Sequence, residues 1–156
     1  MAEYSANATQ TVNPGETVIF TESPIPCTRG LIRHRDDSGN FLLSGWNPVR
    51  YCPCGCVRRN SAEYLIAFGA NIAIPTGGEV GEISLALTLD GSTLPATTMI
   101  VTPAAVNEYF NVSVESAVQI FNGCCESLAI RNTSDQPILI QNANVVISRP
   151  DLYMSY

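Results

Sequence analysis

Six cysteines are the residues of this chain with the widest range of possible chemistry. Three lie in the run Cys52-Pro53-Cys54-Gly55-Cys56, Cys124 and Cys125 are adjacent, and Cys27 stands alone. Cysteines bind metal ions as thiolates, form disulfides, or stay unbonded as small apolar side chains. The spacing leaves three interpretations open: a thiolate metal site on the run of three, disulfides within or between subunits that use any of the six cysteines, and six unbonded thiols.

The run of three cysteines departs from the usual pattern of a zinc site. Structural zinc takes four tetrahedral ligands, commonly from C-x₂-C pairs. Here Cys52, Cys54 and Cys56 are spaced C-x-C-x-C, and His34 is the only histidine in the chain. We therefore predict no bound metal and no cofactor, with these three thiolates as the candidate ligands if a metal does bind.

His34 is also the only histidine available as a catalytic base. It lies between two arginines, and the nearest acidic pair, Asp36-Asp37, falls in a predicted turn, where Asp side chains bind backbone N–H groups. The glycines Gly77-Gly78 and Gly123 belong to predicted hairpin turns rather than to the strand–loop–helix unit of a phosphate site. We therefore expect no catalytic residues and no enzymatic activity.

The charges of the chain are few and unevenly distributed. The net charge of −6 argues against binding nucleic acid through phosphate contacts. Residues 29–59 carry a net charge of +4 and the remainder −10, and all eight basic residues are arginines, which are favoured at protein interfaces. We predict that Arg50, Arg58 and Arg59 contact a partner. Their guanidinium groups would also lower the pKa of the neighbouring thiols, which makes loop 52–56 the first to oxidise.

The chain shows no sequence signal for secretion or membrane insertion. Its first ten residues have neither the basic segment nor the apolar core of a signal peptide. No apolar stretch reaches about 18 residues, which is the length that a membrane-spanning helix needs. We expect a protein made in a cytoplasm, with no membrane partner, that leaves the cell only within a larger assembly.

Short runs of alternating apolar residues dominate the rest of the sequence. In Ile83-Ser84-Leu85-Ala86-Leu87-Thr88-Leu89 every second residue is apolar, which is typical of a half-buried strand, and Asp90-Gly91 follows as a hairpin turn. Residues 64–74 alternate in the same way. We expect further strands at 16–21, 30–34, 41–44, 97–101, 109–114, 118–121, 128–131, 138–140 and 144–148, and one helical turn at 103–107.

This strand spacing predicts an all-β, single-domain antiparallel sandwich of the jelly-roll type. We place the jelly-roll domain at 14–150, an N-terminal arm at 1–13 and an aromatic C-terminal tail at 151–156. The composition, 46% hydrophobic and only 14% charged, indicates that partners cover part of the surface. In the tail, Leu152, Tyr153 and Tyr156 are candidate interface residues.

Several blocks resemble tumour-necrosis-factor-like (TNF-like) jelly rolls. They are Asn13–Phe20, Tyr64–Ile72, Leu85–Gly91 and Leu128–Ser134, in this order along the chain. Three further blocks, Asn71–Gly78, Met99–Val106 and Gln141–Asn144, resemble short proteins encoded among the virion genes of phages and prophages. The resemblance implies a jelly roll that is usually trimeric and stands on a particle or cell surface.

We therefore expect a non-enzymatic virion structural protein, a capsid decoration or head-fibre subunit of a bacteriophage. Its partners would be copies of itself, as a homotrimer, and the major capsid protein, and it would lie on the virion surface. The alternative is a subunit of a bacterial surface or spore appendage, cross-linked through cysteines. A weaker alternative is a glycan-binding module of a phage fibre, in which the sole tryptophan, Trp46, stacks on a sugar.

Overall fold

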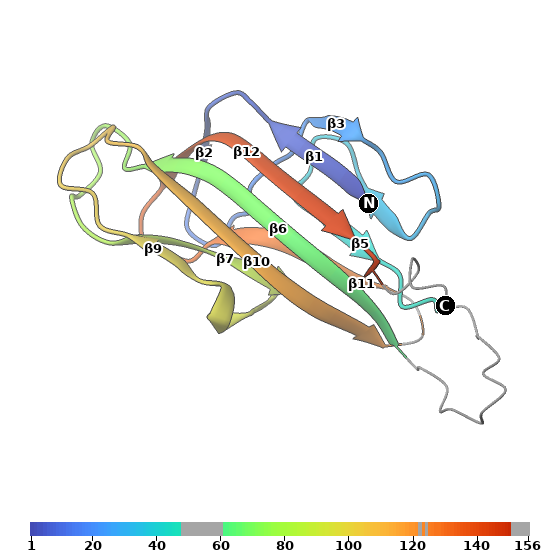
Figure 1. Ribbon diagram of the computed structural model, residues 1–156. Helices are drawn as coiled ribbons and strands as arrows, with labels where there is room; N and C mark the ends of the chain where they lie inside the picture. The colour runs from blue at the N-terminus through green and yellow to red at the C-terminus, as the bar shows by residue number, and fades with distance from the viewer. Residues whose placement is uncertain (48–60, 122, 124, 151–156) are drawn as a thin grey trace, which may run out of the picture.

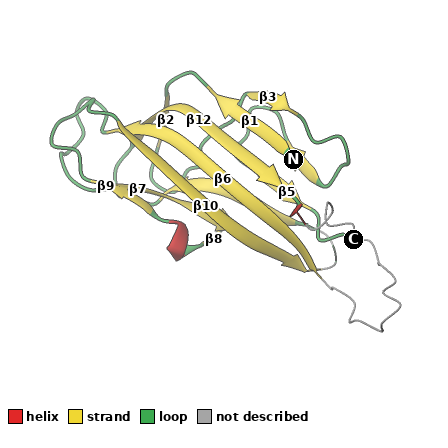
Figure 2. Cartoon of the chain, viewed as in Figure 1, coloured by secondary structure: helices red, strands yellow, loops and turns green. Residues whose placement is uncertain are grey.

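The computed structural model describes residues 1–47, 61–121, 123 and 125–150, which form a sandwich of two antiparallel sheets (Figure 1). This confirms the predicted fold class. Strands and loops make up nearly all of the described chain, and a 3₁₀ turn, Pro95–Thr97, lies beside β8 (Figure 2). In the view of Figure 1, the three longest strands, β6 (Ser61–Ala73), β10 (Phe110–Phe121) and β12 (Ile138–Ser148), run side by side across the front layer.

Each sheet contains six strands. Sheet A has the order β10 (Phe110–Phe121), β6 (Ser61–Ala73), β12 (Ile138–Ser148), β1 (Ala2–Ala6) and β3 (Glu22–Ile25), and β2 (Gln10–Val12) also pairs with β12. Sheet B has the order β4 (Ile32–His34), β5 (Phe41–Leu43), β11 (Glu126–Asn132), β7 (Ile83–Leu89) and β8 (Ser92–Thr93), and β9 (Met99–Val101) pairs with β7.

The core lies between the two sheets and follows the period-two pattern of the sequence. On β6 the inward side chains are fully or almost fully buried: Tyr64, Ile66, Phe68, Ala70 and Ile72. They meet the buried side chains of β7 and β11 from the facing sheet, Ile83, Leu85, Leu87, Leu128 and Ile130. Alternation of this kind forms a sandwich because successive side chains of a strand point to opposite faces.

The N-terminal segment differs from the expected arm. Residues 2–6 form β1, which pairs with β12 on one side and with β3 on the other. Ala2, Tyr4 and Ala6 are at most 4% exposed, so these residues are part of the core. Pairing of β1 with β12 joins segments about as far apart as the chain allows, and the local sequence holds no sign of it.

The strands differ from the prediction in other places as well, and β3 and β8 were not expected. Residues 16–21, expected as a strand, make only two isolated bridges, at Thr17 and Phe20. The paired predictions 109–114 with 118–121, and 138–140 with 144–148, merge into the long strands β10 and β12. In β12 a bulge at Asn142, which has φ +53°, lets the strand continue past its polar middle. The helical turn lies at Pro95–Thr97 instead of 103–107.

Strand β7 is buried on both faces, although its alternation predicted one solvent-facing side. The outward residues Ser84, Ala86 and Thr88 are 8%, 0% and 1% exposed. The Ser84 and Thr133 hydroxyls lie 2.7 Å apart, and the Ser84 N–H donates to the Ser134 hydroxyl. The chain's own loops therefore lie against β7, and its small polar side chains are satisfied inside the protein.

Candidate interaction surface

The outer side of sheet A is formed mainly by the three longest strands of the described chain, which are neighbours in the sheet. Alternation and strand register place on it one residue in two from the three longest strands. We call these residues the A face: Leu65, Ala67, Gly69 and Asn71 from β6, Asn111, Ser113, Glu115 and Ala117 from β10, and Leu139, Gln141, Asn144, Val146 and Ser148 from β12.

The A face is nearly uncharged and rich in small or apolar side chains. No strand of sheet A contains an arginine, and the charged side chains on or beside this face are Glu3, Glu22, Glu63 and Glu115. Solvent-facing strand positions normally carry charged or long polar residues, whereas Leu65, Ala67 and Val146 occupy such positions here. A face of this composition is typical of a surface that another protein covers.

Hydrogen bonds hold the polar side chains of the A face flat against the sheet. The Asn111 amide donates to Asn71 Oδ1 over 3.2 Å across the β10–β6 pair. The Asn144 amide donates to Glu3 Oε1 over 2.6 Å across the β12–β1 pair. These bonds fix the side chains in place, so a partner that packs on the face loses little additional side-chain entropy.

Gly69 lies at the centre of this face, opposite Ser113 on β10 and Asn144 on β12. A Cβ at this position would lie 3.7 Å from the carbonyl oxygen of Val112, which is an ordinary van der Waals contact. The fold therefore has room for a side chain at residue 69. The glycine instead leaves a flat area in the middle of the A face, where another backbone can approach closely.

A second group of residues gathers where β5 and β10 end and β6 begins. We call it the aromatic corner: Trp46, Asn47, Glu63, Gln119 and Phe121. Trp46 and Phe121 are 54% and 69% exposed. Asn47 and Gln119 both donate hydrogen bonds to Ser61, at its carbonyl and hydroxyl oxygens respectively, and Gln119 is directly opposite Glu63. Trp46 was a sequence-based candidate, whereas Phe121 and Gln119 were not.

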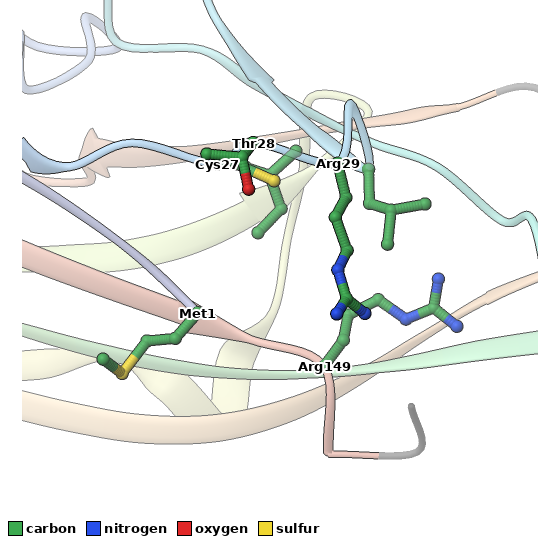
Figure 3. A pocket seen from close by; sticks show the side chains of 7 residues that line it. Met1, Cys27, Thr28, Arg29 and Arg149 are labelled. Carbon is green, nitrogen blue, oxygen red and sulfur yellow. The ribbon is translucent and has the colours of Figure 1, made fainter. Parts of the chain in front are cut away.

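A small pocket lies near the start of the chain and the end of β12 (Figure 3). Its lining includes Met1, Cys27, Arg29 and Arg149. Burial raises the pKa of the Cys27 thiol, but hydrogen bonds from the backbone N–H groups of residues 29, 32 and 31 outweigh it, and the pKa is lowered overall. Cys27 is a half-buried free thiol.

His34 has a structural role rather than the geometry of a catalytic base. Its ring stacks on Phe41 with a centroid distance of 4.7 Å and lies 4.9 Å from the ring of Tyr4. Its Nε2 atom hydrogen-bonds the Ser38 carbonyl at 3.0 Å. His34 therefore closes the 35–40 turn onto an aromatic cluster at the side of the core.

Most of the predicted contact residues lie outside the described residues. These are Arg50, Arg58, Arg59, Leu152, Tyr153 and Tyr156, together with Cys52, Cys54, Cys56 and Cys124. Cys125 is described and half-buried. Within the described ranges no group of three or more His, Cys, Asp and Glu residues is arranged to hold a metal ion. Over the same ranges, no helix has the length and apolarity to span a bilayer.

Comparisons with known proteins identify the class of fold. Eiger TNF from S. frugiperda superposes on 95% of this chain and 90% of its own length, with a TM-score of 0.64 at 11% identity. The globular domain of zebrafish complement 1qA protein covers 93% of this chain and 94% of its own length, with a TM-score of 0.54 at 10% identity. Neither a family model nor a curated protein matches the sequence.

The chain therefore has a TNF/C1q-like jelly-roll fold, as its sequence resemblance implied. The likeness at 10–11% identity shows the fold alone.

Proposed function

We propose that this chain is a non-enzymatic module that forms a homotrimer through the A face and decorates the surface of a bacteriophage particle, as a capsid decoration or head-fibre subunit. The observation that carries the proposal is the A face itself. It is nearly free of charge and bears Leu65, Ala67 and Val146 where a solvent-exposed sheet would bear charges.

The edge of sheet A supports self-association as well. β10 runs for 12 residues and, among the described residues, pairs with β6 alone. Its outer edge has no lysine, no proline and one charge on the A face, Glu115, so it lacks the usual protection of a free strand edge. A neighbouring copy packed over the A face and residues 111–117 of β10 would cover both and leave the end of β10 at Gln119 and Phe121 open. The TNF-like resemblance favours three copies around an axis, and the isologous dimer is the main rival.

The role on a virion draws support from the sequence blocks that resemble phage proteins. Asn71–Gly78 and Met99–Val106 lead into the same end of the sandwich, where the Asn107 N–H donates to the Ile74 carbonyl at 2.8 Å. Gln141–Asn144 lies on β12 next to Asn71. The blocks that carry the resemblance are therefore neighbours in the fold.

Attachment to the particle is tested by co-sedimentation of the purified protein with undecorated capsids of its phage. We expect wild-type protein to sediment with the capsids. Deletion of residues 151–156, or the double variant Arg58→Glu/Arg59→Glu, should lower its occupancy while circular dichroism shows an intact sandwich. Binding of neither wild type nor variant would contradict the virion role. Self-polymerisation into fibres without capsids would support the appendage alternative instead.

A further inference from the structure

We infer that the aromatic corner binds a carbohydrate, with Trp46 and Phe121 packing against the apolar face of a sugar ring and neighbouring side chains accepting its hydroxyl hydrogens. This inference goes beyond the proposed function, since the corner is separate from the centre of the A face. Either claim can fail while the other holds.

The aromatic pair is the first support. At 54% and 69% exposed, Trp46 and Phe121 are the two most exposed aromatic side chains of the described residues. Exposed aromatic groups of this size normally mark a contact surface. The two lie at one place in the fold, because Gly45 packs so tightly on the Phe121 carbonyl that a Cβ at residue 45 would collide with it.

Buried side chains fix the backbone of the segment that carries Trp46. The buried guanidinium of Arg149 donates to the Trp46 carbonyl over 2.7 Å and lies 5.1 Å from the centre of the Tyr64 ring. The Tyr64 hydroxyl in turn donates to the Ser44 carbonyl over 2.6 Å. The segment that carries Trp46 is thus fixed before any ligand arrives, which lowers the entropy lost on binding.

Polar groups beside the aromatic pair have the chemistry that sugar hydroxyls need. Asn47 Nδ2 donates to the Ser61 carbonyl at 2.6 Å, and Gln119 Nε2 donates to the Ser61 hydroxyl at 2.7 Å. Each amide is thereby oriented, and its oxygen has no hydrogen-bond donor among the described residues. The exposed Glu63 carboxylate, opposite Gln119, adds two further acceptor oxygens.

This combination favours a glycan over a nucleic acid. Bases also stack on aromatic side chains, but their phosphates need cations. The aromatic corner holds a carboxylate and acceptor oxygens instead, and the chain has a net charge of −6. The apolar C–H face of a sugar can pack on the aromatic rings of Trp46 and Phe121. Its hydroxyl groups can donate hydrogen bonds to the amide and carboxylate oxygens beside them.

The sole tryptophan makes the test direct, because all tryptophan fluorescence comes from Trp46. The full chain is titrated with the methyl glycosides of mannose, galactose, glucose, fucose and N-acetylglucosamine. We expect a saturable change with at least one glycoside, at millimolar concentration. Phe121→Ala should weaken that binding about tenfold, since loss of one aromatic contact of roughly 1.4 kcal/mol corresponds to that factor. Gln119→Leu should also weaken it.

The matched control is Tyr109→Ala, which removes an exposed aromatic ring outside the corner and should leave the affinity unchanged. Saturation-transfer NMR on Trp46→Ala checks the site without the reporter and should show no contact with the sugar. The inference is overturned if no glycoside gives a saturable response, if Trp46→Ala still binds, or if Tyr109→Ala loses as much affinity as Phe121→Ala. The oligomeric state is measured on the same samples, so a failure here is distinguishable from a failure of the trimer.

Discussion

The outer side chains of β7 in sheet B are buried by the chain's own loops, whereas most outer side chains of β6 and β12 in sheet A are only partly buried. On β7, Ser84 and Thr88 find hydrogen-bond partners within the protein. On the A face, Leu65 and Val146 have no such cover among the described residues. We propose that another copy of the chain covers the outer side of sheet A, as the chain's own loops cover β7.

The largest effect on association is expected from a substitution at the centre of the A face. Gly69→Arg places a long cation where copies meet, and the fold has room for the side chain. We expect loss of the trimer, with each interface weakened by about 2 kcal/mol or more, the size of an interface hot spot. Sedimentation velocity measures the effect. Leu42→Arg, at a 37% exposed position of sheet B, is the matched control and should remain associated.

A second variant loosens sheet B without touching the A face. Asn132 is 1% exposed and its amide donates to the carbonyls of Val12 and Gln136, while its Oδ1 accepts from the Ser134 N–H. Asn132→Ala leaves these buried groups unpaired and should lower the free energy of unfolding by about 2–3 kcal/mol. Urea unfolding measures this. A loss below 0.5 kcal/mol, on the order of a neutral surface change, would show that water replaces the amide.

Removal of the Ser84 hydroxyl tests whether the loops that bury the outer side of β7 contribute to stability alone and not to association. Ser84→Ala deletes the contact with Thr133 at the outer side of β7. We expect a loss of about 1 kcal/mol in the free energy of unfolding, typical of one hydrogen bond, and an unchanged trimer. A change in association after this substitution would mean that sheet B also takes part in the interface.

The smallest expected effect concerns Cys27, which lies on neither face. Its pKa is lower in the folded protein than its ordinary value of 9.0, so the unfolded chain binds more protons between the two values. Wild-type stability should therefore rise with pH just below the ordinary value, and this gain is lost as pH falls through the folded pKa. Cys27→Ser should lack that slope in reducing buffer. Equal pH slopes for both proteins would contradict the assignment.

The sequence predicted the parts of the fold whose alternation is strong and local. The runs at residues 64–74 and 83–89 became β6 and β7, and the sandwich follows from burying their apolar sides. β1 was missed because Ala2 and Ala6 carry little apolar signal and become buried through pairing with β12. The two-sided burial of β7 was missed because it depends on distant loops.

The candidate surfaces were less predictable than the fold. The sequence signal of the A face is the run of uncharged residues, Leu65, Ala67 and Gly69, on the side of β6 that should face solvent. The predicted contact residues, which are Arg50, Arg58, Arg59 and the aromatic tail, lie outside the described residues. Phe121 and Gln119 could not be linked to Trp46 from the sequence, since their proximity depends on the packing of Gly45 against β10.

Native mass spectrometry of the wild-type chain in reducing buffer, at micromolar concentration, tests the central claim most directly. The account predicts a homotrimer that dissociates to monomer on Gly69→Arg and persists on Leu42→Arg. A wild-type protein that is entirely monomeric, or a trimer that Gly69→Arg leaves intact, would contradict the assignment of the A face as the interface.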